Sequence, residues 1–466
     1  MTSAPASAPF PPAAPASAAA PPPPTAPASV APASAATSAP AAPNVPLVAQ
    51  SAPDGAFGTP ATATPPAAVA PEPPAGVWSG VVGQPALVAE LAATAGAAAD
   101  GAGGMTHAWL FTGPPGSGRS VAARAFAAAL QCTGDPAGPR GCGECHDCRT
   151  VLAGTHPDVR SIVPEGLSIS VAEMRALVQA ASRRPVAGRW QVVIIEDADR
   201  LTEGASNALL KVVEEPPART VFLLCAPSDH PDDVSVTIRS RCRRVGLRTP
   251  PADAIAEVLH RRDGIDVETA RWAASVCGGH VGRARRLAVD PQARARREAV
   301  LDVPRAVHAA PDLLAAADAL VAAAETEART QTETRDGAER AELETALGKG
   351  GTGKGAAAAT RGIAGAVRDL ERRQKSRATR TQRDSLDRAL VDLAGFYRDA
   401  LAVSYNAAVP LTHPDRSRDV HTAATHYPRE AVLRRLEAVL ACRQAIELNV
   451  KPRIAVEALV TVLRHG

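Results

Sequence analysis

Hydrophobic positions along the chain fall into short apolar runs that alternate with amphipathic stretches. The short runs are typical of buried strands and lie at 108–111, 190–195 and 220–224, with a fourth beginning at Val245. In the stretches between them, apolar residues recur at helical spacing, over about 85–91, 120–130, 171–182 and 206–215. Strands that alternate with helices predict a doubly wound α/β domain with a parallel sheet over residues 77–249.

After this domain the pattern is that of helices alone. Residues 250–295 predict a small helical lid, and residues 296–466 predict an all-α domain. We expect a flexible insertion near 325–380, where a glycine-rich interruption runs from Gly348 to Gly355. The last helix pair, about 430–445 and 454–463, carries Leu, Val and Ile at positions suited to packing in a bundle.

The first 76 residues differ in composition from the rest. They are almost entirely Ala, Pro, Ser and Thr, with Asp54 and Glu72 as the only charged side chains. Such a segment cannot bury enough apolar surface to offset its ordering entropy, so residues 1–76 are predicted to be a disordered tail.

The chain has 466 residues and a net charge of +3, with no signal-peptide pattern and no apolar run of membrane-spanning length. We therefore expect a multi-domain, soluble, cytoplasmic protein without a membrane segment.

A glycine-rich loop, GPPGSGRS, follows the first apolar run and opens the next helix. Backbone N–H groups of such a loop, with the positive end of the helix behind it, cradle phosphate oxygens. The pattern G-x-x-x-x-G-K-[ST] adds a lysine for the outer phosphates and a hydroxyl for Mg²⁺. Here arginine replaces the lysine. The loop predicts a phosphate site formed by Gly113, Gly116, Gly118, Arg119 and Ser120.

Two acidic residues, Glu196 and Asp197, end the second apolar run. Carboxylates at the carboxyl end of a strand, downstream of a phosphate loop, are placed to handle Mg²⁺ and an attacking water. The alternative is a strand that ends in a solvated acidic turn. Because the glycine loop is present, we favour a place for both residues in a nucleotide site.

Four cysteines follow the loop helix with the spacing C-x₉-C-x₂-C-x₂-C: Cys132, Cys142, Cys145 and Cys148. Four thiolates at this spacing can close a tetrahedral Zn²⁺ site; the alternative is four unrelated free thiols. His146 and His156 could serve as ligands, but a complete set of cysteines makes them unnecessary. Four protein ligands leave no position for water, so we predict a structural rather than catalytic zinc in an insert at 132–148.

Two segments near residues 348–383 resemble functional motifs. Gly348 to Lys354 fits G-x-x-x-x-G-K, yet Gly355 replaces the hydroxyl residue and no apolar strand precedes it, so a linker is favoured. A basic run follows at Arg372, Arg373, Lys375, Arg377, Arg380 and Arg383. It could contact nucleic-acid phosphates, but no aromatic residue is interleaved for base stacking, and a solvated helix face is the more common explanation.

Several of these motifs together resemble bacterial DNA polymerase III clamp-loader subunits. They are the glycine loop, the cysteine insert, Asn207-Ala208-Leu209-Leu210-Lys211 leading to Glu214-Glu215-Pro216-Pro217, and Ser240-Arg241-Cys242. The resemblance runs from about Val77 to Arg286, is thinner over the C-terminal helices, and within the family is strongest to the delta-prime branch. It implies an AAA+ module, a small lid and a helical collar. It also implies assembly with gamma/tau ATPase and delta subunits into a hetero-pentamer that places the sliding clamp on primed DNA.

In that family the arginine of the Ser-Arg-Cys motif acts in trans on the ATP of a neighbouring subunit, and here this residue is Arg241. A guanidinium presented to a γ-phosphate stabilises transition-state charge, by roughly 10³–10⁵ in rate in other phosphoryl-transfer systems. Arg239 is close enough in sequence to be a rival, although it could equally be a surface arginine beside the strand.

The chain departs from the pattern of the family's ATPase subunits in four places. Arginine is not equivalent to lysine at a point-charge site, and the order of the two strand-end acids is reversed. The departures are Arg119, Glu196-Asp197, Ala226 at the sensor threonine (with Ser228 a shifted candidate), and Gly282 at the sensor arginine (with Arg283 one residue away). We expect ATP and Mg²⁺ to be bound weakly or not hydrolysed, in a subunit that lends Arg241 to a neighbour. The alternatives are an ATP-hydrolysing gamma/tau-type motor subunit and, less well supported, a zinc-ribbon DNA-binding protein.

Overall fold

The computed structural model describes residues 75–101, 105–135, 138–309, 313–346 and 356–466. The chain divides into two compact units, residues 1–68 and 69–466, and every described residue lies in the second. The tail predicted to be disordered lies almost wholly outside the described residues, and so does the interruption from Gly348 to Gly355. Within the described part of the chain, no helix is long and apolar enough to cross a membrane.

Five strands form one parallel sheet in the order β2-β3-β4-β1-β5. They are β1 (Ala108–Thr112), β2 (Val159–Ile162), β3 (Gln191–Ile195), β4 (Thr220–Ala226) and β5 (Arg243–Gly246). β1, β3 and β4 are buried along almost their whole length, which agrees with their continuous apolar sequence. β2 was not predicted, because this four-residue edge strand has the polar pair Arg160-Ser161 at its centre.

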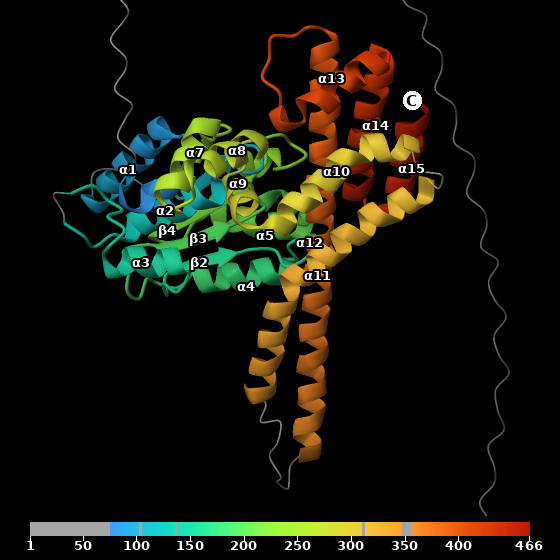
Figure 1. The fold of residues 1–466 in the computed structure, drawn as a ribbon. Coiled ribbons are helices and arrows are strands. Elements are labelled where there is room, and N and C mark those ends of the chain that lie inside the picture. The colour runs from blue at the N-terminus through green and yellow to red at the C-terminus, as the bar shows by residue number, and fades with distance from the viewer. Residues whose placement is uncertain (1–74, 102–104, 136–137, 310–312, 347–355) are drawn as a thin grey trace, which may run out of the picture. The chain divides into compact units, whose positions relative to one another are not determined.

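Helices cover both faces of the sheet (Figure 1). α1 (Pro85–Ala99), α2 (Arg119–Gln131) and α3 (His146–Ala153) belong to one face, and α4 (Val171–Ala181), α5 (Glu203–Glu214) and α6 (Val236–Arg239) to the other. Side chains alternate along a strand, so Trp109 and Phe111 enter the core under α2 while Leu110 enters the core under α5. The predicted α/β fold with a parallel sheet is therefore confirmed.

Three short helices follow the sheet domain: α7 (Ala252–Arg261), α8 (Val267–Val276) and α9 (Val281–Val289). They enclose a small core of their own around Ile255, Leu259 and Ala273. We refer to these three helices as the lid.

The remaining named elements are helical: α10 (Pro291–Ala309), α11 (Leu313–Ala346), α12 (Ala356–Ser404), η3 (Pro414–Arg416), α13 (Ser417–His426), α14 (Arg429–Glu447) and α15 (Pro452–His465). Two further short 3₁₀ helices are η1 (Gly76–Gly80) and η2 (Ala198–Arg200). Leu386, Leu390 and Leu393 of α12 pack in one core with Val432 and Leu459 from the last two long helices. We call α10 to α15 the C-terminal helical domain.

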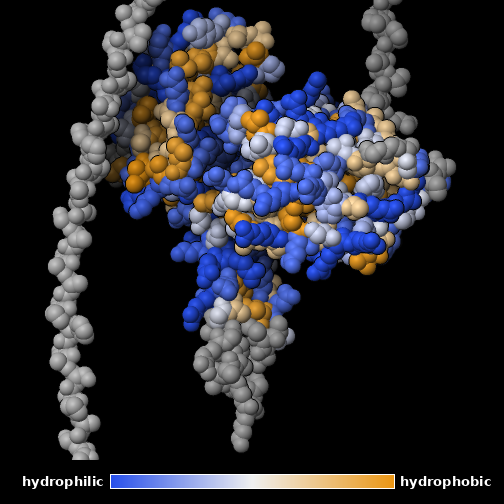
Figure 2. All heavy atoms as spheres, turned by 180° about the vertical axis from the view of Figure 1, so that it is seen from behind, coloured by the Kyte–Doolittle hydropathy of each residue, from blue (hydrophilic) through white to orange (hydrophobic). Residues whose placement is uncertain are grey.

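α11 and the first half of α12 lie side by side as a long hairpin (Figure 1). Much of the expected flexible insertion near 325–380 is therefore helix, on both sides of residues 347–355. Arg377 of α12 explains part of this pairing, because its guanidinium lies 2.9 Å from Glu339 and 3.2 Å from Asp336 on α11. Hydrophilic side chains predominate on the described surface of the hairpin (Figure 2).

The interpretation of the basic run as a solvated face needs correction at two residues. Arg377 is 8% exposed and bound to acids of α11, and Arg380 is turned towards the sheet domain. Arg372 and Arg373 are exposed, as expected for a solvated face. The acids that recruit the buried arginines are distant in sequence, so the run alone could not reveal them.

Candidate functional site

The glycine loop lies between β1 and α2, as predicted, and α2 begins at Arg119 directly behind it. Gly116 and Gly118 have φ values of +86° and +93°, which favour glycine. At Gly116 no other residue fits, because a Cβ there would lie 2.5 Å from the Cα of His280 in the lid. The lid backbone therefore packs directly against the middle of the loop.

The side chains of the loop are turned towards the protein itself. Arg119 donates from one terminal nitrogen to the carbonyl oxygen of Gly113, at 2.8 Å. The thiol of Cys225, near Ser120, is buried, and burial raises its pKa to about 12. The Ser117 hydroxyl is buried without a hydrogen-bond partner among the described residues, so the loop retains one uncommitted donor. Arg119 thus binds a carbonyl of its own loop, whereas a nucleotide site would need a cation that faces the phosphates.

Both acids at the end of β3 are paired with arginines of the same chain. Glu196 accepts from Arg124 of α2 at 2.9 Å, and Asp197 forms an ion pair with Arg380 of α12. Arg380 also donates to the carbonyl of Pro164. One oxygen of each carboxylate is thus taken by an arginine, and helix α12 of the C-terminal domain reaches this edge of the sheet.

The neighbouring Asp199 has a different environment. Its Oδ1 atom is buried without a hydrogen-bond partner within the described part of the chain. Burial, and next the negative charge of Asp197, raise the pKa of Asp199 above its ordinary value. The raised pKa means that the charged form of Asp199 is less favourable here than in water.

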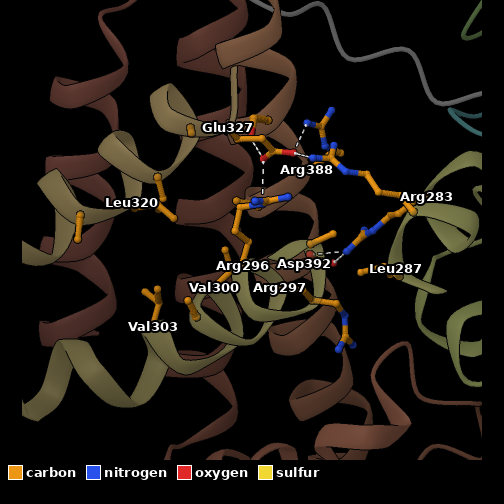
Figure 3. Close-up of a pocket in the computed structure, with 18 of the residues that line it drawn as sticks. Arg283, Leu287, Arg296, Arg297, Val300, Val303, Leu320, Glu327, Arg388 and Asp392 are labelled. Atoms are coloured by element: carbon orange, nitrogen blue, oxygen red, sulfur yellow. Dashed lines mark hydrogen bonds and ion pairs between the residues drawn. The ribbon is translucent and has the colours of Figure 1, made fainter. Parts of the chain in front are cut away.

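The residues at the predicted sensor positions are buried or bind other residues of the chain. Ala226 ends β4 as a buried residue, and the Ser228 hydroxyl donates to Asp233 at 2.5 Å. Arg283 of the lid donates to both carboxylate oxygens of Asp392 on α12, at 2.6 and 2.5 Å (Figure 3). This pair is almost buried, with 14% and 6% of the two side chains exposed. Arg283 thus binds the C-terminal domain rather than facing the glycine loop.

A cavity of about 460 Å³ lies beside this pair, between the lid and α10 to α12 (Figure 3). Its wall is largely alanine with Val300, Val303 and Leu320, and at its rim Glu327 faces Arg388 and Arg296 (Figure 3). Despite burial, the hydrogen bond from Ser385 and the nearby arginines hold the pKa of Glu327 below its usual range. No residue of the glycine loop lines the cavity, so it is distinct from the nucleotide-type site.

Arg241 stands just after α6 and is exposed. One terminal nitrogen donates to the carbonyl of Thr237 at 3.0 Å, and the other lies 2.7 Å from Glu214 at the end of α5. Its rival Arg239 is half-buried and donates to the carbonyl of Asp229 at 2.8 Å. Of the two arginines, Arg241 is the one that the fold leaves at the surface.

The four predicted cysteines come together. Their sulfurs lie within 4.8 Å of one another, and those of Cys132 and Cys142 are 3.7 Å apart. Four sulfurs around a zinc ion at about 2.3 Å lie about 3.8 Å from each other, so the arrangement is the size that Zn²⁺ requires. Neither His146 nor His156 belongs to the cluster, as expected.

The protonation chemistry of the cluster also suits a cation. Burial acts to raise the pKa of Cys145, but hydrogen bonds from Cys148 and Thr133 outweigh it and lower that pKa to about 6. Burial, with the neighbouring thiols alongside, raises the pKa of Cys148. Four thiolates held this close together would repel one another, and a bound cation would offset that repulsion.

The cysteine insert is fastened to η1 at the start of the described chain. Val77 donates its backbone N–H to Gly141, and the Trp78 ring nitrogen donates to Arg140, both at 3.0 Å. Gly141 has φ +92°, and a Cβ there would lie 2.6 Å from Val77. The described part of the insert is thus packed against the start of the α/β domain.

Sequence reasoning missed the partners rather than the site residues. Arg124, Arg380, Asp392 and Glu214 were not singled out as site residues, although each binds a residue that was. The position of Arg124 within α2 does not reveal from sequence that its side chain reaches Glu196 at the end of β3. For Arg380 and Asp392 the pairing depends on how the C-terminal domain packs, which no local pattern encodes.

Comparison with known proteins identifies similar chains for the α/β part. Residues 93–251 match the sequence profile of the family described as DNA polymerase III, delta subunit. The chain is 35% identical over 185 residues to DNA polymerase III subunit delta' of Escherichia coli, covering 39% of this chain and 54% of the relative. It is 40% identical over 157 residues to subunit delta' of Pseudomonas aeruginosa, covering 33% and 47%.

Similarity extends to a second kind of subunit. The chain is 34% identical over 195 residues to DNA polymerase III subunit gamma/tau of Mycobacterium tuberculosis, covering 41% of this chain and 32% of that one. A crystal structure of a DNA polymerase III gamma subunit-related protein from Thermotoga maritima aligns with a TM-score of 0.34 at 15% identity, over 77% of this chain and 94% of that chain.

These matches confirm the resemblance predicted from the motifs. The family match lies within residues 93–251, and the chain spans about half the length of the curated delta' relatives it matches.

Proposed function

We propose that this protein is a delta-prime-like subunit of a DNA polymerase III clamp loader, a subunit that does not hydrolyse ATP itself but supplies Arg241 to the ATP site of a neighbour. The single observation that carries the proposal is the pairing of both strand-end acids with arginines of the same chain, Glu196 with Arg124 and Asp197 with Arg380. A phosphoryl-transfer site needs such carboxylates free for Mg²⁺ and water.

Three further contacts support the absence of hydrolysis. Arg119 binds the carbonyl of Gly113, His280 packs on the loop at Gly116, and Arg283 is bound to Asp392. Reaching a nucleotide would require these contacts to break together with the two acid pairs. The loop could still hold a phosphate through its backbone and the uncommitted Ser117 hydroxyl, so weak ATP or Mg²⁺–ATP binding is compatible with the proposal.

Under this proposal the α/β domain is an AAA+ module, and the C-terminal helical domain is the collar through which the subunit joins gamma/tau ATPase and delta subunits in a hetero-pentamer. The complex would act on the sliding clamp and primed DNA in the cytoplasm. A structural Zn²⁺ on Cys132, Cys142, Cys145 and Cys148 completes the assignment, supported by the spacing of their sulfurs.

The alternative is an ATP-hydrolysing gamma/tau-type motor subunit. The retained backbone of the glycine loop and the similarity to a gamma/tau subunit favour it. It requires Arg119 and Asp197 to leave their present partners when nucleotide binds.

The test is to measure ATP hydrolysis by the purified chain alone, with the release of inorganic phosphate as the readout. We expect turnover no higher than in a buffer control, and the same result for Arg119→Ala. Turnover that Arg119→Ala abolishes would establish the motor alternative.

A further inference from the structure

The motif Glu214-Glu215-Pro216-Pro217 ends α5, and the proposed function gives it no task. Pro216 disfavours helical conformation in the residue before it and, like Pro217, has no N–H to donate, so the helix stops at Glu214. Val213 is buried against the sheet, which fixes the rotation of this last turn. The position of the Glu214 backbone, from which the carboxylate extends, is therefore fixed by the fold.

A glutamate is an unfavourable choice at this point of a helix. The carboxyl end of a helix carries partial negative charge, which favours cations there and disfavours a carboxylate. Lys211 is the basic residue in the last turn, yet within the described residues no ion pair joins it to Glu214. The contact that offsets the unfavourable position is the one with Arg241, at 2.7 Å.

Arg241 is held from two sides. Its backbone N–H donates to Ile238, a buried residue of α6, so its main chain is anchored between α6 and β5. One terminal nitrogen of the guanidinium donates to Thr237 and to the Ser240 hydroxyl, at 3.0 and 3.3 Å, and the other meets Glu214. An arginine has five N–H donors, and among the described residues the contacts of Arg241 leave Nε and one N–H of the second terminal nitrogen uncommitted.

We propose that Glu214 is a positioning residue that holds the guanidinium of Arg241 in the direction needed to reach the phosphate of a neighbouring subunit. This inference rests on the proposed function of Arg241. An exposed long side chain samples many rotamers, and restricting them lowers the entropy lost when the transition state is reached. The Glu214 carboxylate and the Thr237 carbonyl restrict the guanidinium while its uncommitted N–H groups stay free for the phosphate.

The matched control lies next in the chain. Glu215 is exposed, like Glu214, and follows it outside the helix, but no hydrogen bond or ion pair joins it to Arg241 in the described structure. Glu214→Ala and Glu215→Ala remove the same charge from adjacent positions. They differ in the contact to Arg241, so a difference between them reports that contact.

The experiment reconstitutes the loader from this chain and the gamma/tau and delta subunits of the same organism, and measures ATP turnover with clamp and primed DNA. Arg241→Ala, Glu214→Ala, Glu214→Gln, Glu215→Ala and the double variant Glu214→Ala/Arg241→Ala are compared, with assembly checked by gel filtration. We expect Glu214→Ala to lower kcat by a large part of the loss caused by Arg241→Ala, with KM for ATP unchanged. Glu215→Ala should match the wild type.

Two further comparisons separate positioning from general damage. The double variant should be no slower than Arg241→Ala alone, because Glu214 acts only through Arg241. Glu214→Gln should retain more turnover than Glu214→Ala, because an amide oxygen still accepts an N–H bond.

The outcomes distinguish the inference from the function on which it rests. If Arg241→Ala leaves turnover unchanged, the proposed function fails. If Arg241→Ala lowers turnover but Glu214→Ala leaves it unchanged, raises it, or adds fully to Arg241→Ala, the positioning role is overturned while the function of Arg241 stands.

Discussion

Arg380, in the middle of the longest helix of the structure's described part, forms an ion pair with Asp197 at the carboxyl end of β3. The two residues are 183 positions apart in the chain. Asp197 adopts φ +53°, an uncommon conformation outside glycine that aspartate tolerates better than most residues. The C-terminal domain thereby supplies a guanidinium to an acid at the carboxyl end of the sheet.

Replacing Arg380 should destabilise the protein rather than activate it. Its side chain is 16% exposed, so Arg380→Ala leaves the half-buried Asp197 without its partner. We expect a loss of about 1–3 kcal/mol in the free energy of unfolding, seen as a lower thermal midpoint, and no ATP turnover, because Arg119 and the lid keep their contacts. Arg373→Ala is the control, since Arg373 lies on the same helix and is exposed. Equal midpoints for the two variants would contradict a stabilising role for the pair.

The cysteine cluster predicts about one zinc per chain in protein purified without chelators. Cys148→Ser should abolish the metal and lower the thermal midpoint, because Cys148 is fully buried and supplies one of the four sulfurs. His146→Ala should keep the metal, since His146 lies outside the cluster. Elemental analysis of the wild type and the two variants checks the metal content, and thermal melting checks the midpoint. Wild-type protein without metal, or a variant at His146 that loses it, would be inconsistent with the four-cysteine site.

The hairpin should lose stability at low pH through Glu339. Hydrogen bonds from Arg377 lower the pKa of Glu339 from 4.5 to about 2. Because the folded-state pKa is depressed, its contribution is complete above about pH 4.5 and is lost as the pH falls towards 2. Glu339→Gln should therefore melt below the wild type at pH 7, and the gap should shrink by pH 3. Glu342→Gln, an exposed neighbour on α11, serves as the control. If the difference in melting temperature between the wild type and Glu339→Gln does not change with pH, the ionised Glu339 carboxylate is not its cause.

The local part of this account was predictable from the sequence. The apolar runs located β1, β3 and β4 because buried parallel strands are continuously apolar, and the cysteine spacing located the cluster because its turns are short. The edge strand β2 escaped prediction since half of it is polar. Two ion pairs were not predicted either: Arg380 with Asp197, and Arg283 with Asp392. Their members are distant in sequence and meet only when the domains pack together.

The basic run illustrates the same limit. Its six cations look alike in sequence, but Arg377 and Arg380 are bound by acids of other elements while Arg373 is exposed. A helix with charges on several faces does not reveal which face another element will cover. The exposed Arg372, Arg373 and Lys375 agree with the solvated-face interpretation, while Arg383 is partly buried and donates to Asn449 at 2.8 Å.

The most direct test of the central claim is ATP turnover by a reconstituted loader that contains either Arg119→Ala or Arg241→Ala in this subunit. We predict that Arg119→Ala leaves turnover unchanged, since the glycine loop of this chain does no hydrolysis. Arg241→Ala should remove the share of turnover carried by the neighbouring site, where loss of such an arginine costs on the order of 10³–10⁵ in rate. Arg239→Ala should have no such effect, because Arg239 is bound to Asp229 within the chain. Loss of turnover with Arg119→Ala, together with full turnover for Arg241→Ala, would contradict the account.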